Sequence, residues 1–514
     1  MSNTKTIAKN SGWFSIENIT SSIVALVTSI AINRYLGPSK NGYIVYVSYI
    51  ASLVSSLGGM GIPATARKYM AEFIGMGDRG TARYIYRETM RLQAGLATLT
   101  TGGLLIWVLW SAAADYKIAS ALLVLSIWPS MVNTISGQAN QAAEDFFANI
   151  PASLISTVAY FLAIAATVTF HWGVVGVGAA VLLMRTVDFL IRFFPTRKRI
   201  MGWETTHTFP PGLRKRMISF AWQSVASMAV TLIVWGRSEI VLLKSLCPDI
   251  RQVSFYSLAF TMAKQLLLVA TIFGASAGAT IFAQYGRDKT RLPAMTAATF
   301  RYLALTTIPL HVIAASLAVP ALLLLYGHKF EDAALVVTLA PLLCMFKAFI
   351  APAQNLLQSS EKQSFVIAAT VVAGIVDISV AWYFIPAHGA VGACIGNGAA
   401  QATAVGFTWA ASMYLYRITL PWMQVAKVCL ASLLASLTAH FIVLRLAPLW
   451  GILLGGTAAL VVLFFLFYLL RVLEPEDRSR FRTLTGMLPK PIAKPANAIL
   501  WLLIRPADAG LVDL

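Results

Sequence analysis

The chain has 514 residues, of which 58% are hydrophobic and only 12% charged, and its mean hydropathy is +0.71. This composition excludes a soluble globular domain, because that much apolar surface needs lipid as part of its solvent. The net charge of +19 is read as a topology signal and as attraction to anionic lipid headgroups. It is poor evidence for a nucleic acid partner, and we expect none.

Apolar segments long enough to cross a membrane recur along the chain. A spanning helix needs about 20 mostly apolar residues, and fourteen segments between charged or Pro/Gly breaks meet that requirement. In chain order they are residues 13–36, 42–65, 93–112, 118–138, 150–170, 173–194, 217–243, 252–280, 301–325, 331–357, 364–385, 389–416, 424–446 and 449–471. We therefore predict an all-α fold, that of a polytopic membrane protein with about 14 transmembrane helices.

The distribution of lysine and arginine predicts how these helices are oriented, since cytoplasmic loops carry the excess. With the N-terminus inside, cytoplasmic segments hold about 29 of the 40 basic residues, mainly in 66–92, 195–216 and the C-terminal tail. The first helix is too long for the core of a signal peptide and has no small-residue cleavage site, so we expect it to remain as the first span. Both termini are thus predicted to be cytoplasmic.

Three pairs of short motifs repeat in the same order, about 215 residues apart. The first motif ends an apolar helix, the second has the pattern Gln-x-x-Glu, and the third has the pattern Gly-x-x-Gly shortly after a histidine. The pairs are 34–38 with 244–248, 141–144 with 358–361, and 173–176 with 389–392. Internal duplication in an apolar chain is typical of secondary transporters, in which two related bundles rock about a central site.

The repeat predicts how the chain is divided. Helices 1–6 form one lobe and helices 7–12 another, and because six is even both lobes start inside, so the repeats are parallel rather than inverted. The predicted parts are 1–194 for the N-terminal lobe, 195–216 for a basic cytoplasmic linker, 217–416 for the C-terminal lobe, 417–471 for helices 13 and 14, and 472–514 for a cytoplasmic tail. Within this tail, an apolar stretch too short to span is predicted to be a membrane-surface helix.

Three predicted helices carry polar residues along one face, which contact with lipid alone would not favour. The stripes are Asn18, Ser22, Ser29 and Asn33 in helix 1, Ser219, Gln223, Ser227 and Thr231 in helix 7, and Ser254, Ser257, Thr261 and Lys264 in helix 8. They indicate either a water-filled cavity between the lobes or hydrogen bonds between helices. Symmetric placement favours the cavity, whose predicted polar lining is Asn18, Ser22, Asn33, Gln223, Ser227 and Thr261.

Basic residues placed deep in predicted helices point to an anionic substrate. A lysine in the middle of a membrane costs roughly 2.5–3.5 kcal/mol on insertion scales, so it needs water or a counter-charge. Lys264 in helix 8 and Lys347 in helix 10 meet this description. The predicted residues of a cationic, substrate-binding cavity are Lys264, Lys347, Arg237, Arg34 and Arg185.

Acidic residues are few within the predicted helices. Asp377 and Glu17 are the ones placed for proton or sodium coupling. Asp377 could instead simply neutralise Lys264 or Lys347, and the sequence leaves both interpretations open.

Two further groups of charges have spacings that suggest partners. Arg185, Asp188 and Arg192 lie at i, i+3 and i+7, which suits an ion pair within one helix as well as it suits a ligand site. Arg237 and Glu239 are two residues apart and would not share a helix face, so each needs another partner or water.

Signatures of catalysis are missing from the chain. There is no G-x-x-x-x-G-K-[ST] phosphate loop, the six histidines are scattered, and no predicted outer loop exceeds about ten residues. The four cysteines lack the spacing of a metal site. We therefore expect that the protein is not an enzyme and has no catalytic residues, no metal and no cofactor.

A family resemblance rests on the first helices and on the grouping of spans. The residues that carry it are 31–38 with the pattern Arg-x-Leu-Gly-Pro, Gly42 and Tyr43, and 61–63 running into 67–69. With fourteen spans grouped as six, six and two, they resemble the Wzx-type polysaccharide or O-antigen repeat-unit flippases. These flippases belong to the multidrug, oligosaccharidyl-lipid and polysaccharide exporter superfamily, and the resemblance covers most of the chain.

The resemblance implies a transporter in the bacterial inner (cytoplasmic) membrane that serves polysaccharide biosynthesis. It would flip an undecaprenyl-diphosphate-linked oligosaccharide from the inner to the outer leaflet by alternating access, using a cationic cavity. The implied partners are this lipid-linked substrate, membrane lipids, and polysaccharide polymerase or export machinery. The deep cations suit such a substrate, because a diphosphate needs counter-charges and water while its prenyl chain can stay in lipid.

Three alternatives are weighed against this hypothesis. A lipid-linked peptidoglycan-precursor flippase shares the fourteen-span plan and the cationic cavity. A cation-coupled multidrug antiporter would be favoured by twelve spans and acidic cavity residues, whereas this chain has two further helices and more deep bases than acids. A membrane-embedded glycan-transferring enzyme is disfavoured by the short outer loops.

Overall fold

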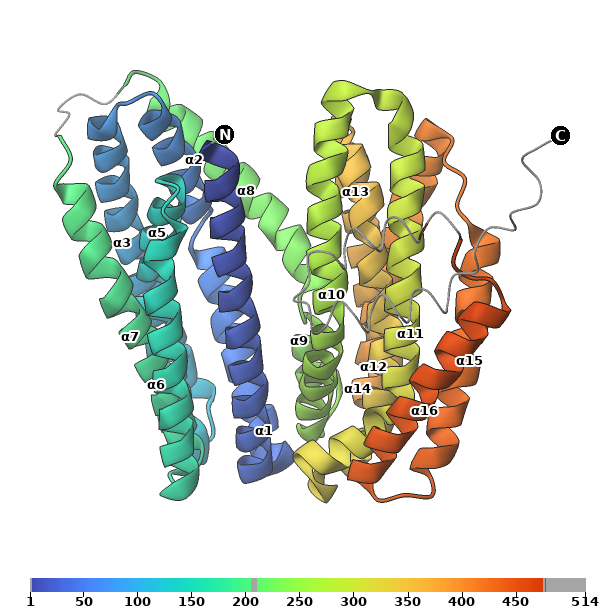
Figure 1. The fold of residues 1–514 in the computed structure, drawn as a ribbon. Helices are drawn as coiled ribbons and strands as arrows, with labels where there is room; N and C mark the ends of the chain where they lie inside the picture. The colour runs from blue at the N-terminus through green and yellow to red at the C-terminus, as the bar shows by residue number, and fades with distance from the viewer. Residues whose placement is uncertain (1, 205–209, 475–476, 478–514) are drawn as a thin grey trace. The chain divides into compact units, whose positions relative to one another are not determined.

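The computed structural model describes residues 2–204, 210–474 and 477 (Figure 1). Only the backbone is described for residues 2–22 and for Phe146, Ser227, Val230, Ile233, Val234, Ala275, Ser276, Ala279, Ala283, Gly286 and Arg287. The described residues form α-helices and short 3-10 helices, with no strand among them. This confirms the predicted all-α membrane fold.

The chain begins with a series of helices that belong to one compact unit, Met1–Ser257. They are α1 (Ser2–Gly58), α2 (Ile62–Gly75), α3 (Arg79–Ser111), α4 (Ala114–Leu125), α5 (Ile127–Ala142), η1 (Phe146–Asn149), α6 (Ile150–Thr169), α7 (Gly173–Met201), α8 (Leu213–Trp235) and α9 (Glu239–Leu246). The long α1 contains the first predicted span and most of the second, and the backbone turns between them at Gly37 with φ 71°. Glycine adopts this left-handed conformation without a steric penalty, and Pro38 then suits the start of the next helix.

A second compact unit comprises Leu258–Leu514, and α10 (Arg251–Arg287) crosses the boundary. Its further helices are η2 (Lys289–Arg291), α11 (Leu292–Tyr326), η3 (His328–Ala333), α12 (Ala334–Cys344), η4 (Met345–Phe349), α13 (Ile350–Ser359), α14 (Gln363–Tyr416), α15 (Trp422–Val443) and α16 (Pro448–Leu469). Like α1, α14 joins two predicted spans, and its backbone leaves helical geometry at Gly389 with φ 51°.

The boundary between the two units lies beyond the predicted linker at 195–216. The reason is that α8 packs on α2 of the first unit: Arg216 pairs with Glu72 at 3.1 Å, and the Lys68 ammonium lies 4.0 Å from the centre of the Phe220 ring. Residues 205–209 of the predicted linker and the predicted surface helix of the tail lie outside the described residues.

Ten described helices are long and apolar enough to cross a membrane, or up to eleven if 23–58 of α1 and α2, bent by 44°, are one span. The count differs from the predicted fourteen where predicted segments merge or break. Two predicted spans share α14, two fall within α1 and α2, and the seventh is divided into α8 and α9. The polytopic membrane class does not depend on this difference.

The two units repeat a structural detail at the Gln-x-x-Glu motifs. Glu144 ends α5 with φ 57°, and Glu361 ends α13 with φ 60°. In each motif the backbone N–H of the glutamate donates to the backbone carbonyl of the glutamine, at 3.0 Å for Gln141 and 3.1 Å for Gln358. A left-handed residue after the last helical turn satisfies carbonyls that the helix leaves unpaired. The sequence repeat therefore corresponds to the same helix end in both units.

Candidate functional site

The first unit contains a polar cavity of about 510 Å³. Its walls come from the second half of α1 and from α2, α3, α4, α5, α7 and α8. The polar residues that line it are Ser48, Ser52, Ser55, Ser56, Arg67, Gln93, Ser126, Ser130, Thr134, Gln138, Arg185 and Ser224. Among these lining residues and their apolar neighbours there is neither a carboxylate nor an aromatic ring. The cavity is thus cationic and rich in hydroxyl and amide groups.

Helical periodicity brings the hydroxyl groups together. Residues four apart lie on one face of a helix, and α5 with its N-cap presents such a series to the cavity: Ser126, Ser130, Thr134 and Gln138. The second half of α1 presents Ser48, Ser52, Ser55 and Ser56. Sequence reasoning missed both series, although their spacing is the signal that marks the stripes in predicted helices 1, 7 and 8.

The two arginines of the cavity are held differently. Arg67 of α2 donates from Nη1 to the side-chain carbonyl of Gln141 at 3.3 Å. Arg185 of α7 is exposed in the cavity wall and forms no ion pair with any described carboxylate. Arg185 was a predicted substrate-binding residue, whereas Arg67 was not: in the sequence it belongs to the basic loop 66–92 and to the segment 67–69 of the family resemblance. Two guanidinium groups therefore line the same cavity.

Two glutamines of the cavity have unused hydrogen-bonding capacity. The side-chain carbonyl oxygens of Gln93 and Gln138 are buried and have no hydrogen-bond partner among the described residues. An unsatisfied buried acceptor costs about 1–3 kcal/mol.

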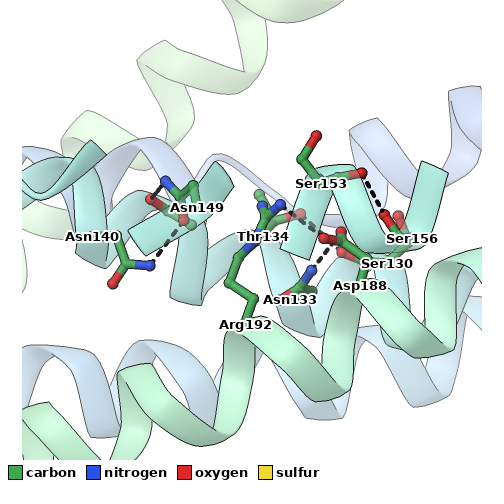
Figure 2. A network of polar contacts seen from close by, with 10 residues as sticks. Ser130, Asn133, Thr134, Asn140, Asn149, Ser153, Ser156, Asp188 and Arg192 are labelled. Atoms are coloured by element: carbon green, nitrogen blue, oxygen red, sulfur yellow. Dashed lines mark hydrogen bonds and ion pairs between the residues drawn. The ribbon is translucent and has the colours of Figure 1, made fainter. Parts of the chain in front are cut away.

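A layer of polar contacts lies behind the cavity wall, between α5 and α7 (Figure 2). Asp188 of α7 accepts hydrogen bonds from Nδ2 of Asn133 at 2.7 Å and from Nη2 of Arg192 at 2.8 Å. Of the two interpretations open for this part of α7, the ion pair within the helix applies to Asp188 and Arg192. Arg185, three residues earlier, stays on the cavity wall.

The same layer continues along α5 and α7. Asn140 donates to Oδ1 of Asn149 at 2.8 Å, as Figure 2 shows, and its own Oδ1 accepts from Arg199 at 2.7 Å. Arg199 is also paired with Asp145, the N-cap of η1. The α5–α7 interface is therefore held by charge-assisted hydrogen bonds rather than by apolar contacts alone.

Of the predicted stripe in helix 1, Asn33 lies in a packed interface. It is 5% exposed, donates to the carbonyl of Ser29 at 2.7 Å, and accepts from Asn41 at 2.8 Å. Asn41 also donates to Ser254 of α10 at 2.8 Å. These contacts are hydrogen bonds between helices, the other interpretation of such stripes, and Asn33 is not among the residues that line the cavity.

Two more predicted residues of the first unit are exposed and lie away from the cavity lining. Arg34 is exposed three residues before the bend at Gly37. Gln223 of α8 is exposed, and its amide lies 3.5 Å from the Ser219 hydroxyl on the same helix. Its neighbour Ser224 faces the cavity instead. A shift of one residue turns a helix face by about 100°, which sequence alone does not resolve.

Arg237 lies in the break between α8 and α9, not within a continuous helix. It donates to the Ser257 hydroxyl at 2.8 Å and is close enough to Glu239 for their charges to interact. Glu239 is fully buried and accepts a hydrogen bond from Tyr256 at 2.8 Å. The expectation that Arg237 and Glu239 would point apart assumes a regular helix, which is interrupted here at Gly236.

In the second unit the structure brings the two predicted lysines together. Lys264 is exposed on α10, and Lys347 is half-buried in η4, where it is close enough to Lys264 for their charges to interact. Thr261 lies one turn before Lys264 and is half-buried, and Asp377 of α14 is 1% exposed. Two neighbouring ammonium groups attract an anion more strongly than either does alone.

A second cavity, of about 460 Å³, lies in the same unit between α10, α11 and α16. Its lining is mostly apolar and includes Leu266, Leu310 and Phe464, whereas Lys264 and Lys347 are not part of it. Hydrocarbon suits this space, so it differs in chemistry from the cavity of the first unit.

Four predicted residues cannot be placed. The side chains of Asn18, Ser22 and Glu17 in α1, and of Ser227 in α8, lie outside the described residues. In the described part of the chain, no three His, Cys, Asp or Glu side chains gather as they would around a metal ion.

Comparison with protein families places the chain. A family model described as polysaccharide biosynthesis protein matches residues 7–285, more than half of the sequence. The chain belongs to this family. The match confirms the resemblance that the first helices suggest. None of the curated protein sequences matches this polysaccharide biosynthesis protein.

Solved structures show the same fold at low sequence identity. A lipid II flippase MurJ in an inward closed conformation has 16% identity and a TM-score of 0.71, covering 88% of this chain and 97% of that one. An inward-facing multidrug resistance MATE family transporter of the MOP superfamily has 13% identity and a TM-score of 0.65, covering 80% and 98%. A MOP superfamily transporter from Pyrococcus furiosus has 16% identity and a TM-score of 0.51, covering 82% and 96%. This polysaccharide biosynthesis protein thus has the fold of these membrane transporters.

Proposed function

We propose that the protein flips an undecaprenyl-diphosphate-linked oligosaccharide from the inner to the outer leaflet by alternating access, as a multi-pass protein of the bacterial inner membrane with cytoplasmic termini. The observation that carries this proposal is the cavity of the first unit, where Arg67 and Arg185 meet hydroxyl and amide groups without any carboxylate in the lining. Membership of the polysaccharide biosynthesis family supports it. Polysaccharide polymerase or export machinery would then act on the product.

Each part of such a substrate has a matching part in the cavity. Guanidinium groups bind phosphate oxygens through charge-assisted, often bidentate hydrogen bonds, which are about twice as strong as neutral ones. The hydroxyl-rich faces of α1 and α5 suit sugar hydroxyls. The prenyl chain can remain in lipid while the polar head is in the cavity.

The cavity chemistry speaks against transport of cationic drugs. A cationic ligand is stabilised by carboxylates or by aromatic faces, and the described lining has neither. The second unit has two further basic residues of its own, Lys264 and Lys347. The membrane potential also favours outward movement of an anion, by about 2.3 kcal/mol per charge per 100 mV.

The proposal is tested by leaflet-resolved transport of a fluorescent undecaprenyl-diphosphate oligosaccharide in proteoliposomes. The variant Arg67→Gln/Arg185→Gln should lose transport, because both phosphate-binding cations of the cavity are removed. Arg87→Gln/Arg91→Gln is the matched control, since these exposed arginines of α3 contact only Glu88 among the described carboxylates. A second arm uses Lys264→Gln/Lys347→Gln, which we also expect to abolish transport.

Three results would contradict the proposal. They are transport that survives removal of Arg67 and Arg185, absence of transport by folded wild type with several glycans, and preferential movement of a cationic dye. Lipid-linked peptidoglycan precursor is included as a competing substrate, because the same cavity chemistry suits its diphosphate. Faster movement of that precursor than of every oligosaccharide would identify the protein as a peptidoglycan-precursor flippase.

A further inference from the structure

We infer that Arg192 is a positioning residue that keeps the cavity cationic by holding Asp188 away from Arg185. This inference deepens the proposed function, on which its biological meaning rests. Asp188 is three residues after Arg185 on α7, and residues with this spacing are neighbours on a helix surface. A carboxylate at that place is the natural partner for Arg185 and would neutralise it.

The contacts of Asp188 direct its carboxylate away from the cavity. Both carboxylate oxygens are used, one by Nη2 of Arg192 at 2.8 Å and the other by Nδ2 of Asn133 at 2.7 Å. The Asp188 and Arg192 side chains are 17% and 18% exposed, so water screens their pairing only partly. Figure 2 shows both donors converging on Asp188 in the layer between α5 and α7.

The facing helix leaves room for Arg192. A Cβ atom on Gly137 of α5 would lie 3.0 Å from Nη1 of Arg192, so the guanidinium group passes over a position where a side chain is absent. Glycine at this point allows Arg192 to lie flat against α5 and reach Asp188. The arrangement therefore depends on both helices and not only on the i, i+4 spacing within α7.

The charges explain the consequence. Arg67 and Arg185 give the cavity lining two positive charges, and the neighbouring charges of Asp188 and Arg192 cancel each other. Without Arg192, Asp188 becomes an uncompensated anion one layer behind the wall and within reach of Arg185. A carboxylate that is no longer paired repels an anion in the cavity and neutralises Arg185, and one unit charge near a partly hydrated site changes anion affinity by about tenfold or more.

The test measures the electrostatic potential of the cavity directly. Thr134 is exposed in the wall, and Thr134→Cys in a full-length chain whose four native cysteines are replaced by serine places one thiol there. The rate of its reaction with a sulfonate-bearing methanethiosulfonate is divided by the rate with a trimethylammonium-bearing one. A positive cavity attracts the anionic reagent and raises this ratio.

We expect Arg192→Gln to lower the rate ratio at least tenfold, and Asp188→Asn/Arg192→Gln to restore it. Arg199→Gln is the matched control, because it removes another ion pair of α7, with Asp145, outside the cavity lining. It should leave the ratio unchanged. A ratio unaffected by Arg192→Gln, or one that the second substitution fails to restore, would overturn the inference.

The rescue separates an electrostatic role from a structural one. If Arg192 only stabilised packing between α5 and α7, removing Asp188 as well would leave the defect or worsen it. The measurement needs no substrate, so it remains decisive if the protein moves none of the glycans tested. If a transported substrate is found, Arg192→Gln should raise KM and the double substitution should restore it. The value of kcat should change less, because the substitution alters how strongly the cavity attracts the anion before transport.

Discussion

Arg301 and Asp477 form a buried ion pair that holds the chain just after α16. Arg301 of α11 donates to both carboxylate oxygens of Asp477, at 2.8 and 2.5 Å, and the hydroxyl of Tyr302 adds a hydrogen bond at 2.7 Å. The Glu474 amide donates to Asp477 at 2.9 Å. The Arg301 side chain is 9% exposed and that of Asp477 is fully buried. Four donors thus fix one carboxylate against the N-terminal part of α11.

Replacing Asp477 by asparagine should destabilise the second unit. Removing one partner of a buried ion pair costs at most about 3–5 kcal/mol, and Glu474, 3.6 Å from Arg301, compensates part of the remaining charge. The melting temperature should therefore fall by at most roughly 5–10 °C in a unit of this size. The measurement is thermal unfolding in detergent. Asp288→Asn is the control, because that carboxylate forms an exposed pair with Arg291 and should change the melting temperature little. Equal effects of the two substitutions would contradict the prediction.

The same contacts predict how stability changes with pH. Burial by itself raises the pKa of Asp477, but the hydrogen bonds from Arg301, Tyr302 and the Glu474 amide outweigh it and hold this pKa below its ordinary value of 3.8. Because the folded-state pKa is depressed, the stabilisation is full above the ordinary pKa and is lost as the pH falls below it toward the folded-state value. Between pH 5 and pH 3 the melting temperature of the wild type should fall more steeply than that of Asp477→Asn. Parallel curves would show that another group is responsible.

At the scale of the elements, one glycine of each Gly-x-x-Gly motif allows close helix packing. A Cβ on Gly392 would lie 2.5 Å from the carbonyl carbon of Phe384, and one on Gly176 would lie 2.5 Å from Cγ2 of Thr167. In both units the second glycine of the repeated motif therefore meets the helix before it at a distance that excludes a side chain. The repeat in the sequence reflects this packing requirement.

A pair of substitutions within α14 tests that requirement. Gly392→Ala forces a methyl group against backbone atoms that cannot move aside cheaply, so it should lower the melting temperature by several degrees. Gly406→Ala meets nothing within 4 Å, and alanine is favoured over glycine in a helix interior by about 1 kcal/mol. It should leave the melting temperature unchanged or raise it slightly in the same unfolding assay. A loss of stability at both positions would mean that α14 needs glycine for flexibility, not for packing.

The sequence predicts where the helices lie in the chain better than it predicts what each helix face contacts. Apolar length and basic loops are enough for the all-α membrane fold, because lipid imposes helices on any spanning segment. They do not tell whether a polar stripe meets water or another helix: Asn33 is bonded to Asn41, whereas the hydroxyls of Ser130 and Thr134 line the cavity. Arg67 is a further example. In the sequence, a basic residue in a predicted loop indicates membrane orientation, and its place in the cavity wall is known only once the helices are packed. Only tertiary packing separates these cases.

At the scale of the whole molecule, the repeat predicts a parallel arrangement of the two halves across the membrane. The two Gln-x-x-Glu turns end at Glu144 and Glu361, and the two Gly-x-x-Gly motifs follow His171 and His388. In a parallel repeat, corresponding turns lie on the same side of the membrane. In an inverted repeat they lie on opposite sides. All four residues are exposed, so single cysteines there would report the side directly.

We expect cysteines at Glu144 and Glu361 to react with a membrane-impermeant maleimide only after the membrane is permeabilised, and cysteines at His171 and His388 to react in intact spheroplasts. The reason is the excess of basic residues in segments predicted to be cytoplasmic, combined with an even number of spans in each lobe. If both members of each pair react from the same side, but from the side opposite to the one predicted, the repeat is still parallel. The orientation of the protein in the membrane would then be the reverse of the predicted one. Reaction of the two members from opposite sides would refute the parallel repeat.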